Sequence, residues 1–265
     1  MPDCRAPVAV FDSGLGGISV LRELVRTLPR ENYLYFGDSL HAPYGTKTPQ
    51  EVISLSLQAA DRLLSQGAKA LVVACNTATS VAVREMRHRY DIPIIGMEPA
   101  AKKALDLDGE HRVLVAATPI TVHGKKMQIL IDRFDKDHLV DLLPLPRLVE
   151  FAEREEFRSE AVHAYLAQEL GRFHLADYSA LVLGCTHFNY FKDTMREIMP
   201  ENMHFVDGNE GTVRELIRQL DARHELEDLP QTVDYYYSGR RVEDPAELAR
   251  IARYLKRLDF VYDIR

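Results

Sequence analysis

Cysteine is scarce in this chain of 265 residues, which contains three, and none of them stands in a short paired spacing with another. A disulfide scaffold or a zinc ribbon needs such pairs, so the sequence predicts reduced thiols. Long apolar stretches are lacking as well, and the first residues form no charged and then apolar leader. We therefore expect a cytoplasmic protein that does not enter a membrane.

An excess of basic residues is also absent. The chain has 33 Lys and Arg against 40 Asp and Glu, a formal net charge of −7, and the basic residues are scattered among acidic ones. This balance argues against nucleic acid and anionic membranes as partners. With 46% apolar and 28% charged residues, the composition is that of a globular protein with one large core or two modest ones.

Short aliphatic runs alternate with amphipathic stretches of helical length, a rhythm that predicts an α/β fold. Most runs are apolar on successive residues, which favours parallel strands buried on both faces. One helix is specified locally, because Thr48 and Glu51 form a capping box around Pro49, and Gly67 can end the helix. The expected strands lie at residues 8–11, 33–36, 71–74, 93–96, 112–116, 139–143, 181–183, 204–206 and 233–237.

The number of expected strands bears on domain organisation. Nine strands exceed the usual sheet of about five or six, so we expect two α/β domains. No linker rich in proline, glycine or serine marks a boundary. The chain is therefore expected to cross between the domains twice, near residues 96–99 and near residues 206–208.

Two segments of the chain resemble each other. LVVACNT at residues 71–77 and LVLGCTH at residues 181–187 are both apolar strands that end in a small residue, a cysteine and two polar residues. Ligands of parallel α/β sheets bind at the carboxyl ends of strands, where a helix N-terminus lowers the pKa of a thiol from about 8.5. Cys75 and Cys185 are thus candidate proton-transfer groups.

A single cysteine at a strand end is more often a packing residue, and Cys4, which lacks such a context, is expected to be inert. Two thiols in matched contexts favour a function. Facing each other, they suit racemisation or epimerisation, in which one group removes a proton from a carbon and the other delivers a proton to its opposite face. Acyl transfer by Cys185 with His187 would leave Cys75 without a role.

Other polar segments follow strands. In DSGLGG at residues 12–17, the glycines allow backbone amides to approach an anion, but Ser19 breaks the dinucleotide-binding spacing, so a carboxylate is the better ligand. The loops at residues 42–45 and 118–121 offer hydroxyl donors, although either could be an ordinary turn. Glu150 and His187 could tune the thiols, although a lone glutamate is usually just solvated.

These segments together resemble the glutamate racemases, a family within the cofactor-independent aspartate/glutamate racemase superfamily. The resemblance covers nearly the whole chain, and four motifs in the right order make it specific. They are FDSGLGG at residues 11–17, GD at 37–38 with PYG at 43–45, ACNTA at 74–78, and LGCTHF at 183–188.

The resemblance implies two similar α/β domains with mainly parallel sheets that face each other across a cleft. The first would comprise residues 1–97 and 208–265 and carry Cys75, and the second would comprise residues 98–207 and carry Cys185. Glutamate would lie between the two thiols. Family members supply D-glutamate for peptidoglycan, which implies a role in bacterial wall synthesis.

The resemblance also implies a role for individual residues. Cys75 would be the acid/base for D-glutamate and Cys185 for L-glutamate, with Asp12, Glu150 and His187 as assistants and with no metal or cofactor. Asp12 and His187 would also contact the substrate. The partner would be the small-molecule substrate alone, and a homodimer is left open. The remaining substrate-binding residues would be Ser13, Tyr44, Gly45, Asn76, Thr77, Thr118, Thr121 and Thr186.

Three other functions remain open from the sequence. The same two thiols could racemise aspartate or another acidic substrate. Cys75, Cys185 and His187 could instead bind zinc in a metal- or anion-binding module, although a fourth ligand is missing. The chain could also act through protein contacts, since some relatives are implied to bind DNA gyrase, but the first expected strand starts within ten residues of Met1 and leaves no N-terminal extension for a partner.

Overall fold

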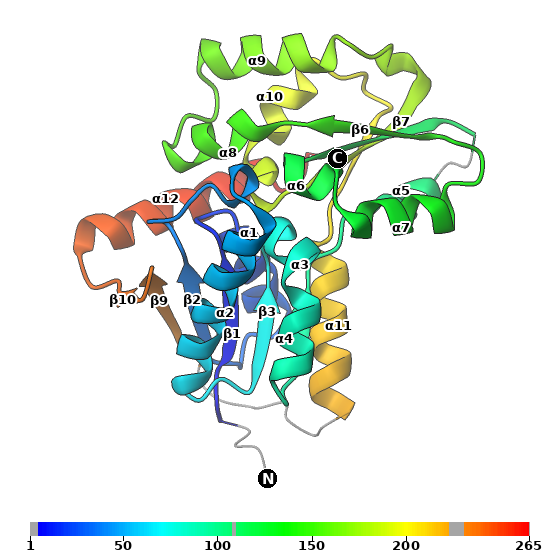
Figure 1. Cartoon of the computed structure of the whole chain (residues 1–265). Helices are drawn as coiled ribbons and strands as arrows, with labels where there is room; N and C mark the ends of the chain where they lie inside the picture. The colour runs from blue at the N-terminus through cyan, green and yellow to red at the C-terminus, as the bar shows by residue number, and fades with distance from the viewer. Residues whose placement is uncertain (1–4, 108–109, 223–230, 265) are drawn as a thin grey trace.

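The computed structural model describes residues 5–107, 110–222 and 231–264, so Cys4 lies outside the described residues. Two sheets with flanking helices make up this part of the chain (Figure 1). None of the helices in the described ranges is long and apolar enough to cross a membrane.

The first sheet has six strands in the order β10-β9-β2-β1-β3-β4, and all neighbours pair in parallel except β10 with β9. Strand β10 was not predicted from the sequence. It follows a tight turn in which Ser238 and Gly239 both have positive φ, 44° and 91°. The strands are β1 Val8–Asp12, β2 Tyr33–Gly37, β3 Ala70–Val73, β4 Ile94–Gly96, β9 Val233–Tyr237 and β10 Arg240–Arg241.

The second sheet has four strands in the order β6-β5-β7-β8, all of them parallel. The strands are β5 Arg112–Ala117, β6 Val140–Pro144, β7 Tyr178–Gly184 and β8 His204–Val206. All nine predicted strands are therefore present, and the predicted α/β fold with two mainly parallel sheets is confirmed. The limits of the two domains at residues 97/98 and 207/208 stay a prediction.

Helices cover both faces of each sheet. The predicted capping box of α2 is present, because the Thr48 backbone amide donates to Glu51 and the Glu51 amide donates to the Thr48 hydroxyl. The helices are α1 Ile18–Thr27, η1 Tyr44–Thr46, α2 Pro49–Ser65, α3 Asn76–Val81, α4 Val83–Arg89, α5 Ala101–Leu105, α6 Pro119–Val122, α7 Lys125–Phe134, α8 Pro146–Glu153, α9 Glu160–Leu170, η2 Leu175–Asp177, η3 Thr186–Phe191, α10 Lys192–Arg196, α11 Asn209–Ala222 and α12 Pro245–Val261.

Successive residues of β1 pack into two different apolar clusters, one on each face of the sheet. Val8 and Val10 of β1 pack in one apolar cluster, while Ala9 and Phe11 pack in a second cluster on the other face with residues of α2, α3 and α4. The first cluster continues into the second sheet through residues such as Leu114. This shared core holds the two sheets in a fixed relation, so that residues from both can form one site.

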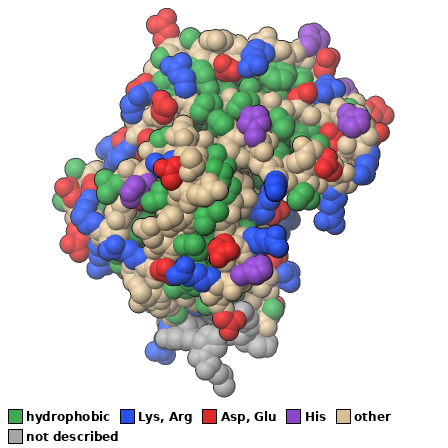
Figure 2. Space-filling view, in the orientation of Figure 1, with side chains coloured by type: hydrophobic (Ala, Val, Ile, Leu, Met, Phe, Trp, Pro, Cys, Tyr) green, Lys and Arg blue, Asp and Glu red, His purple; other side chains and the backbone are tan. Residues whose placement is uncertain are grey.

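The C-terminal helix α12 follows strands β9 and β10 of the first sheet in the chain. It lies along the junction of the two sheets (Figure 1). It contacts α1 beside the first sheet and η3, which follows strand β7 of the second sheet. On the surface, acidic and basic side chains are interspersed over the face shown in Figure 2.

Candidate active site

Cys75 lies at the carboxyl end of β3, where it is the N-cap residue of α3. The Ala78 backbone amide donates to its sulfur at 3.4 Å, and the thiol donates to the Ser13 hydroxyl at the same distance. The residue is 5% exposed. The helix start and the glycine-rich loop after β1 thus hold this thiol from two sides.

Cys185 occupies the matching position after β7, just before η3, and is 6% exposed. Its sulfur lies 3.8 Å from His187 Nδ1. The two cysteines therefore end corresponding parallel strands, as the sequence predicts, but their surroundings differ. Cys75 has a hydroxyl and a backbone amide as partners, whereas Cys185 has an imidazole.

Asp12 connects the two cysteine motifs. It is fully buried at the end of β1, where one carboxylate oxygen accepts from the Gly14 amide at 3.0 Å and the other accepts from the Thr186 hydroxyl at 3.1 Å. A carboxylate of the first sheet is thereby bound to the loop that follows the thiol of the second. The structure thus brings the predicted residues Asp12, Ser13 and Thr186 together.

The carboxylate that contacts His187 is Glu153, and this corrects the prediction of Glu150. Glu153 Oε1 accepts from His187 Nε2 and from the Leu15 backbone amide, both at 2.8 Å. Glu150 is exposed on α8. The helical period contained this signal, because Glu150 lies opposite the apolar face of α8 while Glu153, one turn after Val149, lies on its flank.

Three threonines form a chain of hydroxyl groups between the sheets. Thr77 Oγ1 lies 2.8 Å from Thr118 Oγ1, which lies 3.1 Å from Thr121 Oγ1, and all three residues are buried. Gly45 approaches the same group, because a Cβ atom at this position would lie 2.8 Å from Thr118 Cβ. These four predicted site residues therefore meet at one place.

Two predicted substrate-binding side chains are directed to other protein groups. The Tyr44 hydroxyl donates to Asp38 at 2.7 Å, and the Asn76 amide donates to the Met97 carbonyl at 3.2 Å. Asp38 was not predicted as a site residue, and it also accepts from the Ser238 hydroxyl. The side chain of Tyr44 thus fixes the loop that carries it.

The electrostatics of the two thiols differ. Burial and nearby Asp12 raise the pKa of the Cys75 thiol to about 12, although hydrogen bonds with Ser13 and Ala78 lower it. The sequence predicts a lowered pKa from the helix N-terminus. The helix supplies a single long hydrogen bond, which does not outweigh the loss of solvent. Cys75 is therefore protonated at neutral pH.

The pKa of His187 is also raised, but for a histidine this favours the charged form. Burial by itself lowers its pKa, but hydrogen bonds to Cys185 and Glu153 raise that pKa well above its usual value. Burial raises the pKa of Glu153, yet its contacts with His187 leave it below the usual value. His187 and Glu153 thus form an ion pair, and the imidazole ring lies beside the Cys185 sulfur.

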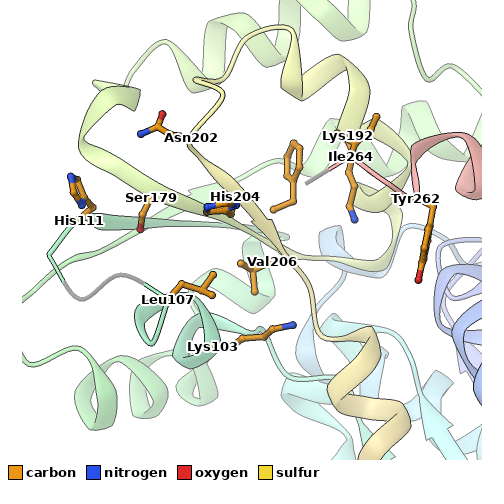
Figure 3. Close-up of a pocket in the computed structure, with 11 residues that line it drawn as sticks. Lys103, Leu107, His111, Ser179, Lys192, Asn202, His204, Val206, Tyr262 and Ile264 are labelled. Carbon is orange, nitrogen blue, oxygen red and sulfur yellow. The ribbon is translucent and has the colours of Figure 1, made fainter.

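Neither of the following two pockets is lined by Cys75 or Cys185. A pocket of about 250 Å³ between α3 and α7 is lined by Asn76 and Thr121 together with apolar residues such as Met127. A pocket of about 520 Å³ beside β8 contains Lys103 and Lys192, and none of its lining residues is a predicted site residue (Figure 3). Within the described residues, no group of three or more His, Cys, Asp or Glu side chains could hold a metal ion.

Gly16 provides a test of the contact between the two motifs. A Cβ atom at Gly16 would lie 2.4 Å from both His187 Nδ1 and Thr186 Oγ1. We expect Gly16→Ala to displace His187 and to lower turnover by about 10²-fold, because small misplacements of reacting groups are costly. Gly211→Ala is the matched control, since its Cβ would meet nothing within 4 Å. Steady-state kinetics and thermal unfolding of both variants would check this, and equal activities would contradict it.

Comparisons with known proteins identify the family of this chain. A family model for Asp/Glu/Hydantoin racemase matches residues 10–216. The glutamate racemase of Campylobacter curvus is 52% identical over 264 residues, which cover 97% of this chain and 99% of that protein. The structure of the Francisella tularensis glutamate racemase in complex with D-glutamate has a TM-score of 0.81 at 26% identity and covers 95% of this chain and 94% of its own.

A second relative of known structure is the glutamate racemase of Escherichia coli, in complex with L-glutamate and the activator UDP-MurNAc-Ala. It has a TM-score of 0.80 at 27% identity and covers 96% of this chain and 95% of its own. Fold, site and comparisons place the protein in a class of isomerases, the amino-acid racemases. Within that class, the chain belongs to the family of the glutamate racemases.

Proposed function

We propose that this racemase interconverts L-glutamate and D-glutamate with Cys75 and Cys185 as the two proton-transfer groups. The observation that carries the proposal is the pair of thiols at matching strand ends, each with its own set of partners. Two relatives that were solved with L-glutamate or D-glutamate support the choice of substrate.

Because the two thiols have different partners, we assign one of them as the base and the other as the acid when L-glutamate is the substrate. A Cys185 thiolate beside the His187 imidazolium removes the α-proton of L-glutamate, and the electron pair stays on the substrate as a carbanion. The Cys75 thiol, protonated at neutral pH, donates its proton to the opposite face and yields D-glutamate. The enzyme then holds a Cys185 thiol and a Cys75 thiolate, the state that accepts D-glutamate.

The groups around the thiols suit an acidic amino acid. Backbone amides of the glycine-rich loop and the hydroxyl groups of Thr77, Thr118 and Thr121 are donors for the substrate carboxylates. Asp12 ends strand β1 and contacts Thr186, and Ser13 follows the strand and contacts Cys75, so these residues connect the two thiol motifs. We assign the substrate cradle to these groups and to the backbone of Tyr44 and Gly45.

The proposed role in the cell is to supply D-glutamate for peptidoglycan in the cytoplasm of a bacterium. Its support is the family, whose compared members include proteins of Campylobacter, Francisella and Escherichia. The proposed domain limits, 1–97 with 208–265 and 98–207, follow the division of the strands between the two sheets.

Substrate choice gives the direct test of the proposal. We expect purified protein to racemise both enantiomers of glutamate, followed by circular dichroism. Its kcat/KM for aspartate should be lower by about 10- to 200-fold, because one missing methylene in a fitted pocket weakens binding by roughly 1–3 kcal/mol. Comparable values for the two amino acids would show that the substrate is chosen wrongly, and no turnover of either glutamate enantiomer would refute the proposal.

A further inference from the structure

The C-terminal end of α8 is held by side chains of α12. The last carbonyl groups of a helix lack partners within the helix, and cationic or hydroxyl side chains can satisfy them. Arg250 Nη2 donates to the Glu153 carbonyl, and the Tyr254 hydroxyl donates to the Ala152 carbonyl. Two residues of the C-terminal helix thus fix the backbone at the residue whose side chain contacts His187.

Arg250 also faces the Glu153 carboxylate. Oε1 of Glu153 is used by Leu15 and His187, while its other oxygen, Oε2, lies 3.8 Å from Arg250 Nη2. The guanidinium is itself held, because its Nε lies 3.4 Å from Glu155 Oε1. A preorganised cation on the free oxygen leaves the carboxylate with one favourable orientation, in which Oε1 points at His187.

The positive charge of Arg250 also favours the ionised form of the Glu153 carboxylate. It contributes to lowering the pKa of Glu153 against the effect of burial, which keeps the carboxylate ionised beside the imidazolium. Arg250 is therefore the cation of α12 that acts on this carboxylate. Among the described residues, further titratable groups that interact with Glu153 include Asp12 from β1, Tyr35 from β2, His187 and Tyr190 from η3, Tyr237 from β9 and Tyr254 from α12.

We propose that Arg250 is a positioning residue for the half of the reaction that uses Cys185. It acts through Glu153 and His187 and does not touch the substrate. The inference rests on the proposed function, because it assigns Arg250 to one of the two thiols. It makes the C-terminal helix, which follows the strands of the first sheet, a support for the thiol of the second sheet.

The test compares Arg250→Met, which keeps the length of the side chain, with Arg250→Lys, which keeps its charge. Lys256→Gln is the matched control, because Lys256 is an exposed cation on the same helix. The two enantiomers have equal free energies, so kcat/KM must fall equally in both directions. A selective effect on one thiol must therefore be measured by primary isotope effects with α-deuterated L-glutamate and D-glutamate.

We expect Arg250→Met to lower kcat/KM by about 10- to 100-fold, as for other small displacements of a reacting group. Proton transfer at Cys185 should become more strongly rate-limiting. The isotope effect should then rise for L-glutamate and fall for D-glutamate. Arg250→Lys should restore much of the activity, and Lys256→Gln should match the wild type in rate and in both isotope effects.

Isotope effects that stay unchanged or move in the same direction in Arg250→Met would overturn the role of Arg250. So would an equal loss in Lys256→Gln, which would indicate general disturbance of α12. If Arg250→Met does not fold, Arg250→Lys carries the test, with smaller shifts of opposite sign expected and their absence counting against the proposal. A wild-type protein that does not racemise glutamate would overturn the proposed function itself, which distinguishes the two failures.

Discussion

Replacing Cys75 or Cys185 by alanine is expected to lower glutamate racemisation by at least about 10³-fold, because each direction needs one thiol as base and the other as acid. Both thiols are buried, at 5% and 6% exposure, but alanine lacks only the sulfur, so the substitution leaves a small cavity. The loss should therefore appear in turnover, measured by circular dichroism, while thermal unfolding changes little.

The surviving thiol gives each variant a distinct residual activity. Cys75→Ala keeps the base that faces L-glutamate, and Cys185→Ala keeps the base that faces D-glutamate. In heavy water each should slowly exchange the α-proton of its own enantiomer, detected by NMR, without producing the other enantiomer. In the wild type, product should carry solvent deuterium while unreacted substrate stays largely protiated at early times. Exchange of the same enantiomer in both variants, or near-normal racemisation in either, would contradict the two-thiol mechanism.

Glu153→Gln is expected to lower kcat/KM by about 10²-fold, because the amide cannot stabilise the His187 imidazolium that supports Cys185. Glutamine keeps an acceptor for the Leu15 amide, so the backbone contact at 2.8 Å can persist. Glu150→Gln is the comparison on the same helix. Its side chain is exposed, and we expect near wild-type kinetics. A larger loss of kcat/KM in Glu150→Gln than in Glu153→Gln would support the prediction of Glu150 made from the sequence.

The pH dependence separates an electrostatic role of Glu153 from a packing role. The pKa of His187 is raised by Cys185 and Glu153, so the imidazolium persists to higher pH than for an ordinary histidine. Without the Glu153 charge this pKa falls, and His187 loses its proton at lower pH. The alkaline limb of the kcat/KM profile should therefore move to lower pH in Glu153→Gln. An unmoved limb with a uniform loss of activity would indicate a packing role alone.

The amino-acid sequence by itself determined much of the fold and the two thiols. Apolar runs on successive residues predict buried parallel strands, and the capping box at Thr48 predicts the start of α2; both features are present. Cys75 and Cys185 were found because each lies in a short motif that repeats along the chain. These are local patterns, whose physical causes act within one strand or one helix turn.

Only the tertiary structure decided which groups surround the thiols. Glu153 replaces Glu150 because the orientation of α8 against η3 selects one face of the helix. Arg250 joins Glu153 across 97 positions of the sequence through the docking of α12. The raised pKa of Cys75 follows from its burial beside Asp12. Contacts between distant segments and the exclusion of water depend on how the elements pack, and no short stretch of sequence records that packing.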